Sequence, residues 1–152
     1  MLAFRTILCP VDFSEDSEIA VRQIAKLTEG QTAKVELLHV VEPIVYPVEY
    51  GIGRVPSIDL EATIAEKAGE KLSELSSHLP GLEVTTRVEF GAPWRRICDI
   101  AEEGGFDLVV LATHGLTGLK HLLLGSVAER VVCHAPCPVL TVKRSDHEKG
   151  NE

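Results

Sequence analysis

The residues best suited to chemistry lie in the stretch THGLTGLKHLLLGS, residues 113–126, which follows the apolar run LVVLA. Gly115 and Gly118 let the backbone turn sharply, and Gly125 and Ser126 stand directly before a segment with helical spacing. Backbone N–H groups exposed by such a turn, together with the positive end of a helix dipole, favour phosphate groups. The pattern therefore predicts an anion site between the turn and the start of the last helix.

Two standard nucleotide motifs do not account for these glycines. Counting from Gly115, the sixth place is Lys120 and no Ser or Thr follows it, so the Walker A pattern fails. Gly51 and Gly53 lead to Pro56 rather than to a third glycine, so the G-x-G-x-x-G pattern fails as well. The glycines of residues 113–126 need a different explanation.

Asp12 is a carboxylate at the end of an otherwise apolar run, ILCPV. It has two interpretations, which are compatible with each other. In the first, the side chain begins an Asx-type turn into the helix that follows. In the second, the carboxylate accepts hydrogen bonds from a ligand, such as the amino group of adenine or a ribose hydroxyl.

Other polar and aromatic residues have a simpler structural interpretation beside a functional one. His39 is expected to be a histidine with its hydrogen bonds satisfied near a strand end, and Trp94 is expected to pack against the edge of the sheet. Cys133, His134 and Cys137 allow a redox or metal sensor, but no second ligand pair completes a tetrahedron, so structural or surface thiols are favoured.

Short β-branched runs alternate with longer segments of helical periodicity, which predicts parallel βαβ units. The expected strands are residues 5–11, 34–41, 82–91, 107–113 and 138–143, and the expected helices are residues 14–28, 58–79, 93–103 and 126–134. Ser14 is predicted to cap the first helix, and Ser126 with Glu129 has the form of a capping box for the last. The fold class is therefore α/β, a Rossmann-like, doubly wound, five-stranded parallel sheet with helices on both faces.

In such a sheet, ligands bind beyond the carboxyl ends of the strands, where the connections diverge to opposite faces. This rule selects positions after the first, second and fourth strands: Pro10, Val11, Asp12, Val40, Val41 and the turn from Ala112 to Gly118. The segment of residues 42–57 contains three prolines and two glycines, and it is expected to form a long surface loop.

The chain resembles the single-domain universal stress proteins from ILCPVDFSEDSEIAV, through VELLHVVEP, to DLVVLATHGLTGLKHLLLGSVAERVVCHAPCPVLTVK. The phosphate motif of that family's ATP-binding branch is G-x-x-G, nine residues, then G-S or G-T. Here the spacing from residue 112 to Ser126 is kept, with Ala112 in place of the first glycine. The resemblance covers residues 1–144, and residues 145–152 form a polar C-terminal tail.

The resemblance implies specific contacts. Adenine and ribose would contact Pro10, Asp12 and Val40. The phosphates would contact the turn, including Ala112, Thr113, His114, Gly115 and Gly118, and the helix start at Gly125, Ser126 and Val127. His114 is either a phosphate contact or an exposed turn residue. Ala112 is expected to weaken binding at most, since a strand-end residue usually has a negative φ.

Composition narrows the classes of partner. The net charge of −8 disfavours nucleic acid and acidic membrane surfaces, and no segment of the 152 residues is apolar and long enough to insert in a membrane. The cytoplasm is the expected location, since the N-terminus lacks the features of a signal peptide. No catalytic elbow, carboxylate pair or metal cluster is evident, so slow ATP hydrolysis or autophosphorylation is the most that is expected.

The expected function is that of an ATP-binding regulatory protein in the stress response, with magnesium carried by the nucleotide and an unidentified protein partner. The alternative is a dimeric stress scaffold that binds no nucleotide. In both, the last strand is expected to lie at a sheet edge and to form a homodimer through Val139, Leu140 and Val142.

Overall fold

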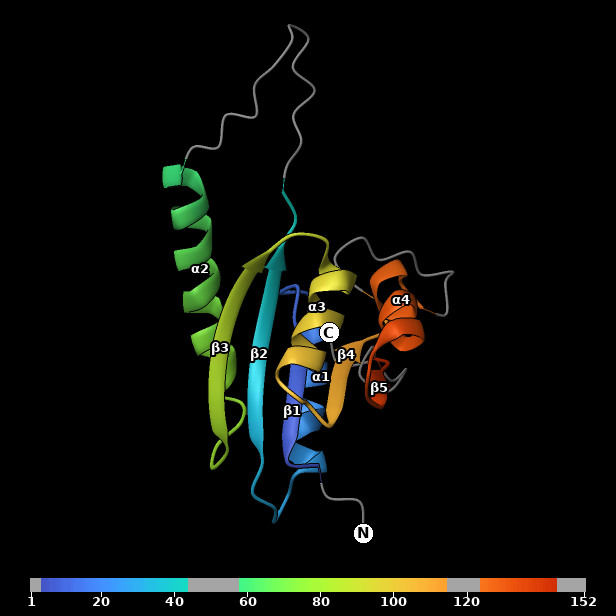
Figure 1. Cartoon of the computed structure of the whole chain (residues 1–152). Helices are drawn as coiled ribbons and strands as arrows, with labels where there is room; N and C mark the ends of the chain where they lie inside the picture. Colours follow the sequence, from blue (N-terminus) through green and yellow to red (C-terminus); the bar gives the residue numbers. More distant parts are fainter. Residues whose placement is uncertain (1–3, 44–57, 115–123, 145–152) are drawn as a thin grey trace, which may run out of the picture.

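Five parallel strands form one sheet in the order β3-β2-β1-β4-β5 (Figure 1). The computed structural model describes residues 4–43, 58–114 and 124–144. The strands are β1 (Thr6–Pro10), β2 (Lys34–Val41), β3 (Glu83–Phe90), β4 (Leu108–Ala112) and β5 (Val139–Val142). The helices are α1 (Glu15–Leu27), α2 (Ile58–Ser76), α3 (Pro93–Glu103) and α4 (Ser126–His134). The predicted fold class and order of elements are confirmed.

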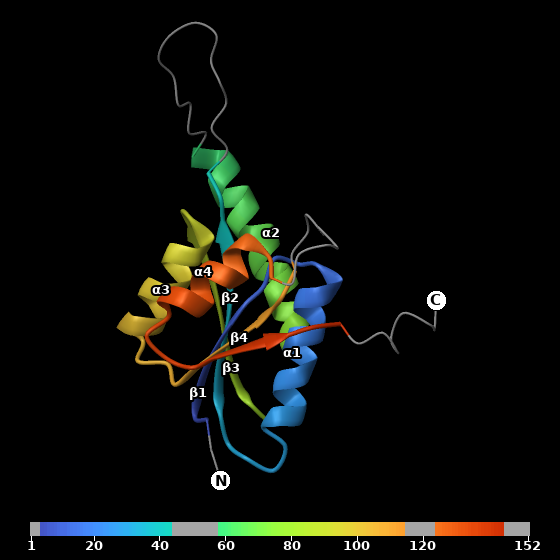
Figure 2. The same ribbon diagram turned by 90° about the vertical axis from the view of Figure 1, so that its right-hand side faces the viewer.

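Each strand contributes side chains to both faces of the sheet. Along β1, Ile7 and Cys9 belong to the core cluster beneath α1 and α2, whereas Leu8 belongs to the cluster beneath α3 and α4. Figure 2 shows the two helix pairs on opposite sides of the strands. Because both faces are covered, β1 and β4 are nearly continuous apolar runs rather than alternating with polar residues.

The start of α1 agrees with the prediction, and the start of α4 does not. Ser14 caps α1 and accepts a hydrogen bond from the Ser17 N–H. The cap of α4 is Gly125, with φ −67° and ψ 161°, and it makes no side-chain capping bond. The predicted capping box of Ser126 and Glu129 is therefore wrong by one residue, because Ser126 is already the first residue of the helix.

The last strand, β5, lies at one edge of the sheet, as predicted. Leu140 is 38% exposed, but Val142 is 8% exposed and belongs to the core cluster beneath α1. The Val142 side chain is therefore covered within the single chain, and the pairing of two copies through Val139, Leu140 and Val142 stays a prediction. The opposite edge of the sheet is formed by β3.

Two expected segments fall outside the described residues: most of the loop expected at residues 42–57, and the polar tail at residues 145–152. Among the helices that the structure describes, none combines the length and the apolar character that crossing a membrane requires.

Candidate functional site

A cavity of about 470 Å³ lies at the carboxyl ends of β1, β2 and β4, beside the starts of α3 and α4. Its volume falls within the range of roughly 300–1,000 Å³ that is typical of small-molecule sites. In the strand order, β1 separates β2 from β4, and the chain leaves β1 and β4 toward opposite faces of the sheet. The cavity therefore lies where the topology predicts a ligand site.

All predicted site residues that the structure describes line this cavity. They are Pro10, Val11, Asp12, Val40, Ala112, Thr113, His114, Gly125, Ser126 and Val127. Gly115 and Gly118 lie outside the described residues. The structure thus brings together the end of β1, the end of β4 and the start of α4, which are far apart in the sequence.

Asp12 forms the predicted Asx-type turn and lines the cavity at the same time. Ser14 donates its backbone N–H to Asp12 Oδ1 at 3.0 Å and its hydroxyl to the same oxygen at 2.5 Å. These bonds fix the carboxylate at the point where the chain passes from β1 into α1. A carboxylate held in this way presents acceptors to donor groups of a ligand.

His39 is satisfied by hydrogen bonding, as predicted, and it also lines the cavity. Its Nδ1 lies 2.8 Å from the carbonyl oxygen of Val11. Because a carbonyl group only accepts, Nδ1 carries the proton in this bond. The bond ties the end of β2 to the residue that precedes Asp12.

Ala112 ends β4 in extended conformation, in register with Val142 of β5. In the described part of the chain, Phe13 is the only residue other than glycine with a positive φ, so Ala112 has a negative one. Its side chain is partly buried against the core cluster beneath α1. This backbone conformation is open to any residue, so a glycine is not required at position 112.

The start of α4 presents backbone donors to the cavity. Gly125 donates its N–H to the carbonyl oxygen of Thr113 at 2.6 Å, which joins the helix to the end of β4. The next N–H groups, of Ser126 and Val127, belong to the first turn of the helix and have no carbonyl four residues earlier within it. They can donate to an anion at the positive end of the helix dipole.

The sequence interpretation missed part of the cavity wall. The additional lining residues are Ser17, Leu38, His39, Glu42, Pro93, Ile97, Leu111 and Ala128. The strand-end rule had already selected Val41, and extending it by one residue would have found Glu42. The contribution of α3, through Pro93 and Ile97, depends on how the helix packs over β2 and β3, and the sequence carries no local signal for it.

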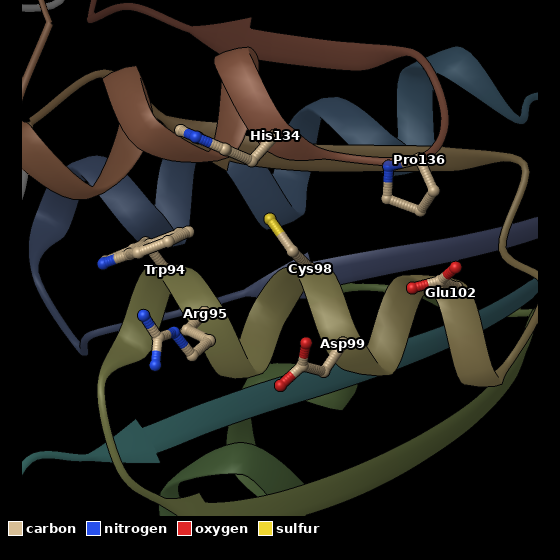
Figure 3. A pocket seen from close by; sticks show the side chains of 7 residues that line it. All are labelled: Trp94, Arg95, Cys98, Asp99, Glu102, His134 and Pro136. Carbon is tan, nitrogen blue, oxygen red and sulfur yellow. The ribbon is translucent and has the colours of Figure 1, made fainter.

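A second pocket, of about 390 Å³, lies between α3 and α4, and no predicted nucleotide contact lines it. Figure 3 shows Cys98 pointing from α3 toward α4. Trp94 lies against His134 of α4, with ring centroids 5.0 Å apart, rather than against the edge of the sheet. Burial, followed by the nearby Asp99 carboxylate and Cys137, raises the pKa of the Cys98 thiol, so this thiol is less reactive than an ordinary one.

The hypothesis of a metal sensor finds no support in the part of the chain that the structure describes. No group of three or more His, Cys, Asp and Glu side chains there could hold a metal ion. Burial, followed by Asp107, also raises the pKa of Cys137, and Cys133 is exposed.

Comparison with known proteins agrees with the fold. The model of the universal stress protein family matches residues 3–143. Universal stress protein MJ0577 of Methanocaldococcus jannaschii is 32% identical over 157 residues, which cover 94% of this chain and 97% of that protein. The solved structure of MJ0577 superposes with a TM-score of 0.81 at 34% identity, covering 95% of this chain and 99% of the other.

The same fold occurs in a universal stress protein of Archaeoglobus fulgidus solved in complex with dAMP. It has a TM-score of 0.64 and 24% identity, and the match covers 94% of this chain and 100% of that one. Together with the family match over nearly the whole length, the sheet order and the cavity at the strand ends lead to one conclusion: this chain belongs to the universal stress protein family.

Proposed function

We propose that the protein binds an adenine nucleotide in the cavity at the carboxyl ends of β1, β2 and β4, with ATP as its ligand. The observation that carries the proposal is that Asp12 and the start of α4 line the same cavity. One end of the cavity thus offers carboxylate acceptors, and the other offers backbone donors. A nucleotide has the matching groups, since its base and ribose donate hydrogen bonds and its phosphates accept them.

The walls suit the base of the nucleotide. Leu38, Val40 and Leu111 bring apolar side chains to the cavity beside Asp12. The amino group of adenine can donate to the carboxylate, whereas guanine has an acceptor oxygen at that ring position. In the orientation that sets the amino group of adenine against Asp12, a guanine would set its oxygen against the carboxylate, so we expect adenine to be favoured in that orientation.

The α4 end of the cavity suits the phosphates. Gly125 has no side chain between the first turn of the helix and the cavity, and the amides of Ser126 and Val127 follow it directly. These residues would hold the phosphate nearest the ribose. Magnesium would be carried on the phosphates of ATP and would neutralise part of their charge. The solved complex of a protein of this fold with dAMP supports the choice of an adenine ligand.

We infer that binding serves regulation in the stress response rather than turnover. The cavity is formed by separate elements, so a ligand that contacts both Asp12 and α4 stabilises one arrangement of them. A change in that arrangement would be transmitted to a protein partner. The exposed edge strand β5 is the surface at which we expect two copies of the chain to pair.

Asp12→Asn tests the proposal. Asparagine keeps an acceptor for Ser14, so the turn is retained, but the charge and one acceptor oxygen for the ligand are lost. We expect calorimetric titration to show roughly tenfold weaker ATP binding, as for loss of a hydrogen bond to a charged group. Asp99→Asn on α3, which lines the other pocket, is the matched control. Unchanged affinity in Asp12→Asn would contradict the proposed site.

A further inference from the structure

Phe13 has an unusual backbone conformation at the edge of the proposed site. Its φ is 64°, and no other residue except glycine has a positive φ in the ranges that the structure describes. A bulky side chain is rarely found in this region, and such conformations cluster at functional sites. Phe13 lies between Asp12, which lines the cavity, and Ser14, which holds the Asp12 carboxylate.

This conformation places the Phe13 ring behind the cavity rather than in it. The ring packs against the core cluster beneath α1 and α2, and it is not part of the cavity wall. Its centroid lies 4.4 Å from that of His39, which does line the cavity. On α2, the Lys71 Nζ lies 5.1 Å from the centroid of the same ring.

His39, near the end of β2, contacts the residues on both sides of Asp12. His39 donates from Nδ1 to the carbonyl oxygen of Val11, and the same imidazole packs against Phe13. Asp12 stands between these two residues in the chain. The cavity groups Asp12 and His39 therefore share one support, which consists of residues 11–13.

We propose that Phe13 is a positioning residue of the nucleotide site, and this inference rests on the proposed function. Its backbone sets the direction of the Asp12 carboxylate, and its ring holds the His39 imidazole. The contact with Lys71 extends this support to α2.

The test compares Phe13→Leu with Phe4→Leu. Phe4 packs against the same core cluster but precedes β1, at the end of the strand remote from the cavity. We expect calorimetry with AMP to show about fivefold weaker binding for Phe13→Leu, since an aromatic pair is lost, and less than about twofold for Phe4→Leu. Phe13→Tyr, which keeps the ring, is expected to restore the affinity.

Two further readouts separate positioning from a general effect on the fold. The NMR signal of the His39 imidazole in the ligand-free protein is expected to shift in Phe13→Leu and to stay unchanged in Phe4→Leu. In a double-mutant cycle, His39→Gln is expected to weaken AMP binding little further once Phe13→Leu is present. If Phe13→Leu does not fold, Phe13→Gly replaces it, because glycine adopts a φ of 64° without strain.

The binding measurements distinguish a failure of the role given to Phe13 from a failure of the proposed function. Wild-type protein that binds AMP, with Phe13→Leu binding equally well, would overturn the role of Phe13 and leave the proposed function intact. Equal losses in Phe13→Leu and Phe4→Leu, or strict additivity with His39→Gln, would overturn it in the same way. Wild-type protein that binds neither AMP nor ATP would overturn both proposals.

Discussion

At the scale of single residues, Gly125 is held so close to the end of β4 that a side chain has little room. Its N–H lies 2.6 Å from the carbonyl oxygen of Thr113, and an added Cβ would lie 3.2 Å from that oxygen. Its φ is −67°, so glycine serves this close approach and not a left-handed backbone. Gly125 therefore has two roles: it joins α4 to the sheet, and it leaves the proposed phosphate site free of a side chain.

Gly125→Ala is expected to lower the free energy of unfolding by about 1 kcal/mol, because the Cβ crowds Thr113 and alanine is a poor helix cap. Gly69→Ala is the matched control, since a Cβ there meets nothing within 4 Å in the middle of α2. In that variant the free energy of unfolding should rise by about 0.5–1 kcal/mol, because alanine has a higher helix propensity than glycine. Urea unfolding measures the free energy of unfolding of both variants. Equal changes of the same sign in Gly125→Ala and Gly69→Ala would contradict the role given to Gly125.

At the scale of elements, the helix starts show what local sequence can and cannot predict. Ser14 was predicted as a cap because acidic residues and helical periodicity follow it directly, and the structure agrees. At α4, a helix start was correctly predicted near residue 126, but Ser126 matched the capping-box pattern while Gly125 takes the cap position. The glycine is selected by its contact with Thr113, which is a tertiary interaction and leaves no local pattern.

The two serines should therefore differ in their effect on stability. Ser14→Ala removes a cap that accepts from the Ser17 N–H and donates to Asp12, and it should destabilise the protein by about 1 kcal/mol. Ser126→Ala removes no capping bond and should cost less than half of that. Thermal unfolding compares the two, and an equal loss of stability would restore the capping-box interpretation.

The edge strand β5 shows a second property that local sequence does not predict, namely which of its side chains are buried. Its position at the edge was predicted because it is the last strand, but Val142, one of the residues named for the expected dimer contact, has a buried side chain. Which residues of a short edge strand are covered depends on how far α1 extends over the sheet. Leu140 remains exposed and is therefore the better residue with which to test dimerisation.

We expect Leu140→Glu to convert a dimer to monomers, because a charge at the paired edge is desolvated without a partner. Leu60→Glu is the control, since Leu60 is 50% exposed on α2, which packs against β3 at the opposite edge. Sedimentation velocity reports the mass of each variant. Dimers in Leu140→Glu, or monomers in both variants, would argue against an interface at β5.

At the scale of the whole molecule, the alternation of strands and helices was enough to predict the fold class and the place of the cavity. The rule for parallel sheets predicted the strand ends as the ligand site, and the glycines of residues 113–126 predicted the start of α4, which the resemblance also implied. The wall supplied by α3 and the support supplied by Phe13 depend on packing between distant elements. Neither follows from periodicity or from spacing along the chain.

A calorimetric titration of nucleotide-stripped protein decides whether this cavity binds adenine nucleotides. With magnesium present, we expect micromolar affinity for ATP and clearly weaker binding of GTP, because the proposed base orientation sets the amino group of adenine against Asp12 and would set the oxygen of guanine there instead. Absence of heat with ATP, AMP and GTP at several temperatures would show that the cavity is not a nucleotide site, and equal affinity for ATP and GTP would refute the proposed role of Asp12.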